Sequence, residues 1–301
     1  MNYNCIKEIC EKYGVEFLFD EPLLKYTSFE IGGKCDMLVK PDSADCISEI
    51  LKCCRNNAIK YYILGKGSNV LVSDSGLKGV VIVISQAFSK VQLEDDDYIY
   101  CDAGASLTKV CTFAKENSLT GLEFAYGIPG SVGGALYMNA GAYGGEIKDV
   151  VESCLYIDDD LKVSEMKADE MELSYRHSIF CEKNYVILGV RFKLEKGDKA
   201  EITEKMSELM EKRRSKQPLE YPSAGSTFKR PEGDFAGRLI EASGLKGFTV
   251  GGAQVSEKHS GFVINKGGAT CADVLGVVSA VKEKVYADSG VMLECEIRIL
   301  E

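Results

Sequence analysis

The sequence predicts an α+β protein built from three consecutive blocks, and three observations support this class. Segments with apolar residues at helical spacing are interleaved with short apolar runs that favour strands. Two glycine-rich turns fall in different blocks before residue 150. After Lys196 the character of the chain changes, because three helical segments then alternate with only short strands. We therefore expect blocks at residues 1–90, 91–195 and 196–301.

The overall composition narrows the class of function. A chain of 301 residues is long enough for two or three domains with real cores. Its net charge of −10, from 36 Lys and Arg against 46 Asp and Glu, argues against a general binder of nucleic acid or acidic membranes. The first residues, MNYNCIKEICEKYG, lack the basic start and apolar core of a signal peptide, and no run of about 18 apolar residues follows. We expect a cytoplasmic protein.

The cysteines and histidines do not indicate a metal site. The twelve cysteines are scattered without C-x-x-C pairs, and only two histidines are present. We therefore expect reduced thiols, buried or half-exposed, and no bound metal.

The first block is predicted to be a compact β-α-β-β unit that follows an N-terminal helix. Residues 3–13 carry apolar side chains at helical spacing. A second helix, capped by Asp42 or Ser43, has an inward face of cysteine, isoleucine and leucine. The strands of the unit are predicted at 35–40, 61–64, 70–72 and 80–84.

The turn Gly65-Lys66-Gly67-Ser68-Asn69 joins two of these strands and is a candidate anion site. Successive backbone N–H groups in glycine-rich turns form a concavity that binds anions. An ordinary hairpin loop explains the same residues equally well.

The second block is predicted from another set of strands and one helix. Strands are expected around the acidic turn 94–97, and Ser106 is expected to cap a helix that runs through Glu116. Further strands are predicted at 150–157, 161–166 and 185–194.

The stretch from Gly121 to Asp149 is the strongest sign of a ligand site. Seven of the nineteen positions from Gly127 to Gly145 are glycine, and within the stretch no Lys or Arg occurs before Lys148. Glycine permits φ > 0 and close backbone approach, and backbone amides can then neutralise a phosphate. This arrangement suits the buried pyrophosphate of a dinucleotide. A surface loop is the alternative, although the interleaved apolar residues favour burial. The patterns of a Rossmann domain and of a P-loop are missing from the sequence.

The third block is predicted to hold three helices and short strands. One helix ends before Pro218, a second runs from an Asp234 cap to Gly244, and the third spans 270–290. Strands are predicted at 254–256, 262–265 and 292–299, and a tight turn at 221–228. Six basic residues indicate either a site for a diphosphate or a solvated helix end: Lys212, Arg213, Arg214, Lys216, Lys229 and Arg230.

Eight motifs resemble those of the UDP-N-acetylenolpyruvoylglucosamine reductase family, also called UDP-N-acetylmuramate dehydrogenases. They are YTSFEIGGKCD, GKGSNVLVSD, GIPGSVGGALYMNAGAYGGE, LSYR, KQP, SAGSTFKRPEGDFAGRLIEASGLKG, GGAQVSEKHSGFVIN and LECEIR, and they run in order from Tyr26 to Arg298. The resemblance implies a two-subdomain FAD-binding fold of the vanillyl-alcohol oxidase type, at 1–90 and 91–195, plus an α+β substrate-binding domain at 196–301. The span from Arg176 to Lys216 is too short for the substrate-capping loop of the first subclass, so the chain resembles the second subclass of the family, which lacks this loop.

The resemblance also implies an activity. NADPH would reduce non-covalent FAD, which would then reduce the enolpyruvyl group of UDP-N-acetylglucosamine-enolpyruvate to give UDP-N-acetylmuramate. This reaction belongs to peptidoglycan precursor synthesis, and so to cell-wall biogenesis, cell shape and division. The enzyme must stabilise negative charge that develops beside the substrate carboxylate and then protonate C2. We expect a monomer that acts on small molecules, without nucleic-acid or membrane partners.

The family motifs assign roles to particular residues. By resemblance, Ser226 is the proton donor, Arg176 meets the carboxylate and enolate, and Glu296 orients the site or relays a proton. Glu294 lies two residues from Glu296, so that choice depends on the motif, and His177 stands where many members have Asp. The implied FAD-lining residues are Gly65, Gly67, Ser68, Asn69, Gly127, Pro129, Gly130, Ser131, Gly133, Gly134, Asn139, Gly141 and Ala142. The implied substrate contacts are Tyr175, Lys216, Arg230 and His259.

Two other functions remain to be weighed against the reductase. A flavin-dependent oxidase of the same fold, using oxygen as acceptor, would leave Ser226 and the basic residues without a role. A non-catalytic flavin or nucleotide-sugar binder is disfavoured because Ser226, Arg176 and Glu296 occur together.

Overall fold

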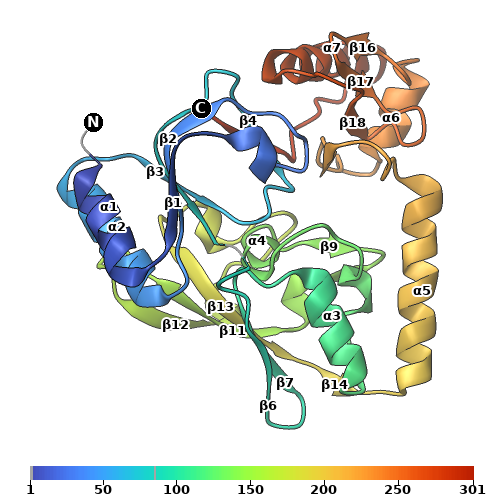
Figure 1. Cartoon of the computed structure of the whole chain (residues 1–301). Coiled ribbons are helices and arrows are strands. Elements are labelled where there is room, and N and C mark those ends of the chain that lie inside the picture. Colours follow the sequence, from blue (N-terminus) through green and yellow to red (C-terminus); the bar gives the residue numbers. More distant parts are fainter. Residues whose placement is uncertain (1–2, 85) are drawn as a thin grey trace. The chain divides into compact units, whose positions relative to one another are not determined.

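The structure, a computed structural model, describes residues 3–84 and 86–301, which form two compact units (Figure 1). The first unit holds residues 3–19, 37–66 and 79–212, apart from residue 85. The second holds residues 20–36, 67–78 and 213–301. Each unit has its own cluster of buried apolar side chains. The observed mixture of helices and strands confirms the predicted α+β class.

The first unit contains two amphipathic helices that pack side by side, α1 (Asn4–Tyr13) and α2 (Ala44–Asn56), both blue in Figure 1. Ser43 caps α2, because its hydroxyl accepts the Cys46 N–H at 3.4 Å. A four-stranded sheet has the order β1-β2-β5-β3, and β3 pairs in parallel with β5. Its strands are β1 Glu16–Pro22, β2 Lys34–Lys40, β3 Tyr61–Leu64 and β5 Leu77–Val83.

The first unit also holds an antiparallel five-stranded sheet of order β12-β11-β13-β7-β6 (Figure 1). Its strands are β6 Val91–Glu94, β7 Tyr98–Asp102, β11 Val151–Ile157, β12 Val163–Lys167 and β13 Val186–Lys193. Helix α3 (Leu107–Glu116) starts at the predicted Ser106 cap. The glycine-rich stretch supplies η2 Glu123–Ala125, α4 Val132–Tyr137, β9 Gly141–Ala142, β10 Gly145–Glu146 and η3 Ile147–Asp149. Shorter elements are β8 Leu119–Thr120, η4 Ala168–Glu170, η5 Ile179–Cys181 and β14 Glu195–Lys196.

Helix α5 (Lys199–Lys216) follows and confirms the predicted helix before Pro218. Its buried positions recur at helical spacing, at Ile202, Met206, Leu209 and Arg213.

The second unit is organised around a sheet of order β15-β18-β17-β16. Helix α7 (Cys271–Ser289) supplies the largest buried face, and Thr270 forms a capping box with Asp273 at its start. The other elements are η1 Leu23–Tyr26, β4 Val70–Val72, β15 Ser223–Ser226, α6 Ala236–Ala242, β16 Thr249–Val250, β17 Ala253–Val255, β18 Phe262–Asn265 and β19 Arg298–Leu300.

Strand β4 corrects the predicted β-α-β-β unit. It lies in the second unit and pairs in parallel with β19, so that Leu71 is buried in the second core. The turn at 65–69 is therefore no hairpin, since β3 pairs instead with β5. The predicted strand at 292–299 is correspondingly short and begins only at Arg298.

Two further predictions in the third block were wrong in detail. The segment 221–228 is not a tight turn, because Ser223–Ser226 forms β15 and pairs with β18. Helix α6 begins at Ala236, with Phe235 at the N-cap position rather than Asp234. Asp234 instead accepts the Phe235 N–H and pairs with Arg238.

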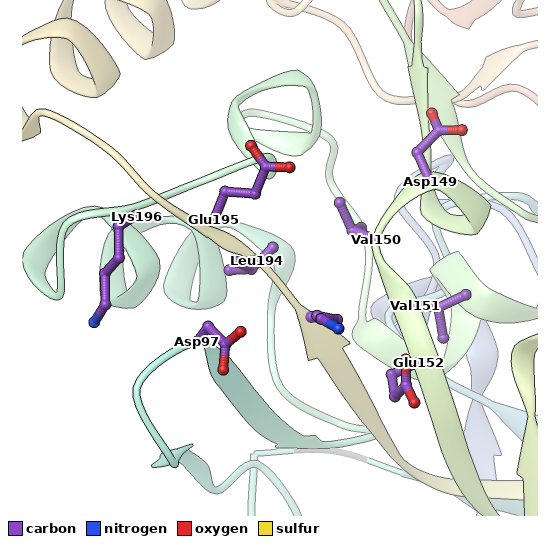
Figure 2. Close-up of a pocket in the computed structure, with 9 residues that line it drawn as sticks. Asp97, Asp149, Val150, Val151, Glu152, Leu194, Glu195 and Lys196 are labelled. Carbon is purple, nitrogen blue, oxygen red and sulfur yellow. The ribbon is translucent and has the colours of Figure 1, made fainter.

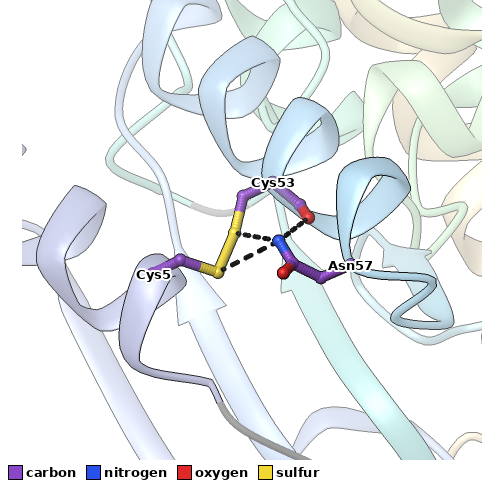
Figure 3. The surroundings of a disulfide bond; sticks show 3 residues. All are labelled: Cys5, Cys53 and Asn57. Carbon is purple, nitrogen blue, oxygen red and sulfur yellow. Dashed lines mark hydrogen bonds between the residues drawn. A yellow bond between two sulfur atoms is a disulfide. The ribbon is translucent and has the colours of Figure 1, made fainter.

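Cys5 and Cys53 form a disulfide that joins α1 to α2, which corrects the expectation of reduced thiols for this pair (Figure 3). The packing of the two helices brings their Cα atoms to 6.6 Å, within the range that a disulfide spans. The Asn57 side-chain amide lies 3.6 Å from the Cys5 sulfur and 3.7 Å from the Cys53 sulfur. The other ten cysteines are free thiols.

Candidate active site

Tyr175 and Arg176 lie at the tip of a tight turn in the first unit. Two backbone hydrogen bonds between Ser174 and His177, of 3.2 and 3.1 Å, close the turn. Arg176 has a φ of +55°, which an arginine adopts only where its surroundings enforce it. The position of this guanidinium is therefore set by backbone conformation as well as by side-chain contacts.

The glycine-rich stretch holds this turn in place. Arg176 Nη2 donates a hydrogen bond to the Gly141 carbonyl at 3.2 Å, and Asn139 Nδ2 donates one to the Ser174 carbonyl at 2.9 Å. The guanidinium also lies 5.0 Å from the centre of the Tyr175 ring, within cation–π range. Four of the residues singled out in the sequence, Asn139, Gly141, Tyr175 and Arg176, thus lie close together.

The segment before α4 packs tightly on neighbouring backbone. Ser131 is buried and caps α4 by accepting the Gly134 N–H at 3.3 Å. The Gly133 N–H donates to the Ala103 carbonyl at 2.9 Å, and a Cβ on Gly133 would lie only 2.9 Å from the Ala103 Cβ. Glycine is required at 133 because any side chain would push this backbone away from its support.

Gly65, the first residue of the 65–69 turn, meets the other glycine-rich stretch within the first unit. A Cβ on Gly65, which directly follows β3, would overlap Oγ of Ser131 at the start of α4. The backbone at Gly65 and the start of α4 are thus brought together. These features fit the pyrophosphate of a dinucleotide such as FAD, which backbone amides can hold.

Ser226 ends strand β15 in the second unit, where it stands opposite Phe262 of β18. The register shifts between Ser223 and Ser226, and Gly225 takes a φ of +75°. Thr227 is buried. Its N–H donates a hydrogen bond to the Gly261 carbonyl at 2.8 Å, and its hydroxyl oxygen accepts one from the Val263 N–H at 3.0 Å. These bonds fix the backbone that carries the half-buried Ser226 hydroxyl.

The backbone of Glu296 is hydrogen-bonded to Thr227, the residue that follows Ser226. Its N–H donates to the Thr227 carbonyl at 2.8 Å, and its own carbonyl accepts Asn69 Nδ2 at 3.2 Å. Glu294, in contrast, is exposed and forms an ion pair with Lys229 at 3.3 Å. The backbones of both acids lie beside the segment that follows Ser226, because the Glu294 carbonyl also accepts the Lys229 N–H at 2.8 Å. The two side chains differ in exposure, since Glu296 is half-buried and Glu294 is exposed.

His259 is held as a neutral imidazole. Its Nδ1 accepts the Gly261 N–H at 3.1 Å, so the proton of the neutral ring sits on Nε2. Burial lowers the pKa of His259 below its usual value, which favours the uncharged form at neutral pH. The imidazole can therefore offer one N–H donor without adding charge.

The remaining predicted substrate contacts lie at more open positions. Arg230 is exposed and its guanidinium lies 4.4 Å from the centre of the Phe235 ring. Lys216 is exposed at the end of α5.

A polar hollow of about 500 Å³ lies elsewhere on the first unit, next to β11 and β13 (Figure 2). None of its lining residues was predicted to be a catalytic, cofactor-binding or substrate-binding residue: Asp97, Asp149, Val150, Val151, Glu152, Lys193, Leu194, Glu195 and Lys196. Its lining mixes acidic and basic side chains, and we give it no role in the candidate site.

One residue of the site was not anticipated from the sequence. Glu146 accepts a hydrogen bond from Asn139 at 3.0 Å. It stands inside the glycine-rich motif, but no spacing rule relates it to an arginine thirty positions later.

No metal centre or membrane segment accompanies these sites in the described parts of the chain. Across residues 3–84 and 86–301, no three His, Cys, Asp or Glu side chains are placed to hold a metal ion. None of the helices over the same residues is both long and apolar enough to cross a bilayer.

Family models match both parts of the chain. Residues 35–166 match the FAD binding domain, and residues 217–300 match the C-terminal domain of UDP-N-acetylenolpyruvoylglucosamine reductase. The fold and these matches therefore define an FAD-dependent oxidoreductase with a flavin domain of the vanillyl-alcohol oxidase type.

Similar proteins identify the family within that class. A UDP-N-acetylenolpyruvoylglucosamine reductase of Clostridium botulinum (strain Hall) is 50% identical over 283 residues, covering 94% of this chain and 92% of the relative. One of Clostridium perfringens (strain SM101) is 50% identical over 281 residues, covering 93% and 92%. The crystal structure of the Thermus caldophilus enzyme has a TM-score of 0.81 at 34% identity and covers 95% of this chain and 99% of that one. The grass pollen allergen Phl p 4 has a TM-score of 0.51 at 14% identity, over 65% of this chain and 44% of that one, and shares the fold alone.

The chain belongs to the UDP-N-acetylenolpyruvoylglucosamine reductase family. It is an FAD-dependent oxidoreductase of peptidoglycan precursor synthesis that uses NADPH as reductant and acts on small molecules.

Proposed function

We propose that this chain reduces UDP-N-acetylglucosamine-enolpyruvate to UDP-N-acetylmuramate, and that Arg176, Ser226 and Glu296 carry the chemistry. The observation that carries the proposal is the attachment of the Arg176 turn to the glycine-rich segment through Gly141 and Asn139. This attachment presents a permanent positive charge beside the backbone that suits FAD. When bound, FAD supplies the hydride that it has received from NADPH.

Arg176 meets the substrate carboxylate and stabilises the enolate oxygens. A guanidinium is planar, stays charged at every relevant pH and can contact two oxygens at once. Its bond to Gly141 O and its contact with the Tyr175 ring leave it less freedom than a solvated arginine. Preorganised charge of this kind stabilises a transition state because it does not need to reorient during the reaction.

Ser226 donates the proton to C2 of the enolate. A hydroxyl is a weak acid, but an enolate that bears a carboxylate is a strong base, so the transfer is favourable. The backbone bonds of Thr227 hold the serine in one place. Glu296, bonded to the carbonyl of that same Thr227, orients the hydroxyl or relays the proton that replaces the one donated.

The proposed binding residues fall into two groups, one for FAD and one for the UDP-sugar. Backbone and side chains of the two glycine-rich turns hold FAD: Gly65, Gly67, Ser68, Asn69, Gly127, Pro129, Gly130, Ser131, Gly133, Gly134, Asn139, Gly141 and Ala142. The substrate contacts are Tyr175, Lys216, Arg230 and His259. The neutral His259 would donate Nε2–H to an oxygen of the UDP-sugar, while Lys216 and Arg230 supply charge for its diphosphate.

The wider properties of the protein belong to the same proposal. The three-part division at 1–90, 91–195 and 196–301 separates two flavin-binding subdomains from a substrate-binding domain. The protein acts as a cytoplasmic monomer of the second subclass, without nucleic-acid or membrane partners. The short connection from Arg176 to Lys216, which contains β13 and α5, supports the absence of a capping loop.

The test separates the two half-reactions in the absence of oxygen. NADPH should bleach the flavin of the wild-type protein, and the enolpyruvyl UDP-sugar should then restore its colour. In Ser226→Ala we expect normal bleaching, but re-oxidation slower by roughly 10²–10³, the usual cost of one lost donor. Ser223→Ala, in the same strand, is the matched control and should behave like wild type.

Equal loss of both half-reactions in Ser226→Ala would remove the proposed role. The same protein in air distinguishes the oxidase alternative. Steady hydrogen peroxide production from NADPH without any UDP-sugar would favour an oxidase.

A further inference from the structure

Asn139 joins its own segment to the neighbouring residues Glu146 and Lys148 and to the Arg176 turn, which lies 35 positions further along the chain. Its side chain is fully buried, and Nδ2 donates to Glu146 Oε2 at 3.0 Å and to the Ser174 carbonyl at 2.9 Å. Its Oδ1 accepts the Lys148 N–H at 2.9 Å. Both amide hydrogens and the amide oxygen are thus used, which fixes the orientation of the side chain. Asn139 also has a φ of +40°, so this conformation depends on its partners.

Glu146 reaches the Arg176 turn through a second connection as well. In the β9–β10 pair it stands opposite Gly141, whose carbonyl accepts the hydrogen bond from Arg176 Nη2. A Cβ on Gly141 would lie only 2.7 Å from the Glu146 Cγ, so the Glu146 stem packs directly on the Gly141 backbone. One side chain therefore contacts both groups that hold the arginine turn.

The charge of Glu146 suits this arrangement. Its Oε2 lies 2.9 Å from Lys148 Nζ, and the hydrogen bond from Lys148, with a smaller contribution from Asn139, lowers the pKa of this carboxyl. An ionised carboxylate can only accept hydrogen bonds. It therefore directs the Asn139 amide group toward itself and Ser174, and leaves Oδ1 for Lys148.

We propose that Glu146 is a positioning residue for Arg176, acting through Asn139 on one side and Gly141 on the other. The inference rests on the proposed role of Arg176 in meeting the substrate carboxylate. In this role Glu146 acts on the arginine turn and does not itself take part in the reaction. It holds the 174–177 turn so that the Arg176 guanidinium stays in position to contact the substrate carboxylate.

The test compares the same two anaerobic half-reactions in Glu146→Ala, Arg176→Ala and the double variant. We expect Glu146→Ala to bind FAD and to be reduced by NADPH at the wild-type rate. Its re-oxidation by the enolpyruvyl UDP-sugar should be slower by roughly 10- to 100-fold, the effect of displacing a catalytic group by about 1 Å. The double variant should be no slower than Arg176→Ala, because a displaced arginine and a missing one lose the same interaction.

Three further variants separate positioning from folding. Glu146→Gln keeps an acceptor at the same reach and should recover most of the re-oxidation rate. Glu146→Asp keeps the charge but shortens the side chain, so it should be as slow as Glu146→Ala and also serves if that variant does not fold. Glu152→Ala, a nearby acid that pairs with Lys167 at 3.7 Å, is the matched control and should be unaffected.

Different outcomes overturn different statements. If Arg176→Ala re-oxidises normally, the proposed function of Arg176 is wrong. If Arg176→Ala is slow but the Ala and Asp variants of Glu146 both re-oxidise normally, only the positioning role is wrong. Additive losses in the double variant, or equal loss of both half-reactions in Glu146→Ala, would also remove that role.

Discussion

The contact between Gly65 and Ser131 yields a quantitative prediction, because it is where Gly65 of the 65–69 turn meets the other glycine-rich stretch. In Gly65→Ala the new methyl group would overlap Oγ of Ser131, whereas the Ser131 Cβ lies 3.6 Å away, at ordinary contact distance. Ser131 is buried and its hydroxyl caps α4, so Oγ cannot simply turn aside. Forcing an extra methyl into such a site typically costs about 1–3 kcal/mol.

Removing the hydroxyl changes this balance. Ser131→Ala alone loses the cap of α4, at a cost of about 1 kcal/mol. In the double variant the overlap disappears together with Oγ, so the total cost should remain about 1 kcal/mol instead of the roughly 2–4 kcal/mol of the summed single changes. The expected coupling free energy is thus about 1–3 kcal/mol in favour of the double variant.

The assay is urea unfolding of all four proteins at one fixed FAD concentration, followed by far-UV circular dichroism. Gly134→Ala is the control, because its methyl would lie 3.3 Å from the same Oγ within a helix, where alanine is favoured over glycine. Additivity of the two single changes within about 0.5 kcal/mol would refute the reasoning, as would a Gly65→Ala variant as stable as wild type.

Two further predictions concern stability. The Cys5–Cys53 disulfide spans 48 residues of sequence, and closing a loop of that size stabilises a fold by roughly 4 kcal/mol. A phosphine reductant should therefore lower the urea midpoint of the wild-type protein but not that of Cys5→Ser, and an unchanged wild-type midpoint would contradict the bond. Burial lowers the pKa of His259 in the folded protein. As the pH is lowered below about 6.5, the imidazole is therefore protonated in the unfolded chain but not yet in the folded protein. The free energy of unfolding should decrease over this range, until the pH reaches the lowered pKa of the folded state. The melting temperature of His259→Gln should consequently fall less than that of wild type between pH 7 and 5.5, and parallel curves would show that His259 is not the group responsible.

The candidate site was only partly predictable. Motifs made Arg176, Ser226 and Glu296 the candidate catalytic residues, because family motifs are contiguous in the chain. The partners of Arg176 were not predictable as contacts, since the bond to Gly141 joins residues 35 positions apart. Glu146 was not predictable for the same reason, because it is linked to Arg176 only through its contacts with Asn139 and Gly141 in the folded protein.

The sequence by itself determined the elements whose causes are local. Helices α2, α3 and α7 start where Ser43, Ser106 and Thr270 can bond an N–H three residues later, and that interaction needs no distant partner. The glycine density at 127–145 likewise predicts a candidate backbone site without knowledge of the fold.

Only the tertiary structure decided which distant segments pair. Residues 70–72 read as a strand in isolation, but whether they join β3 or β19 depends on which core buries Leu71. Residues 223–226 became a strand because β18 supplies hydrogen-bond partners 36 to 41 positions away. Cys5 and Cys53 became a disulfide because two helices pack together. The physical reason is common to all three: a cap or a turn is stabilised by neighbours along the chain, whereas a strand pairing or a cross-link is stabilised by partners that only the complete fold brings into contact.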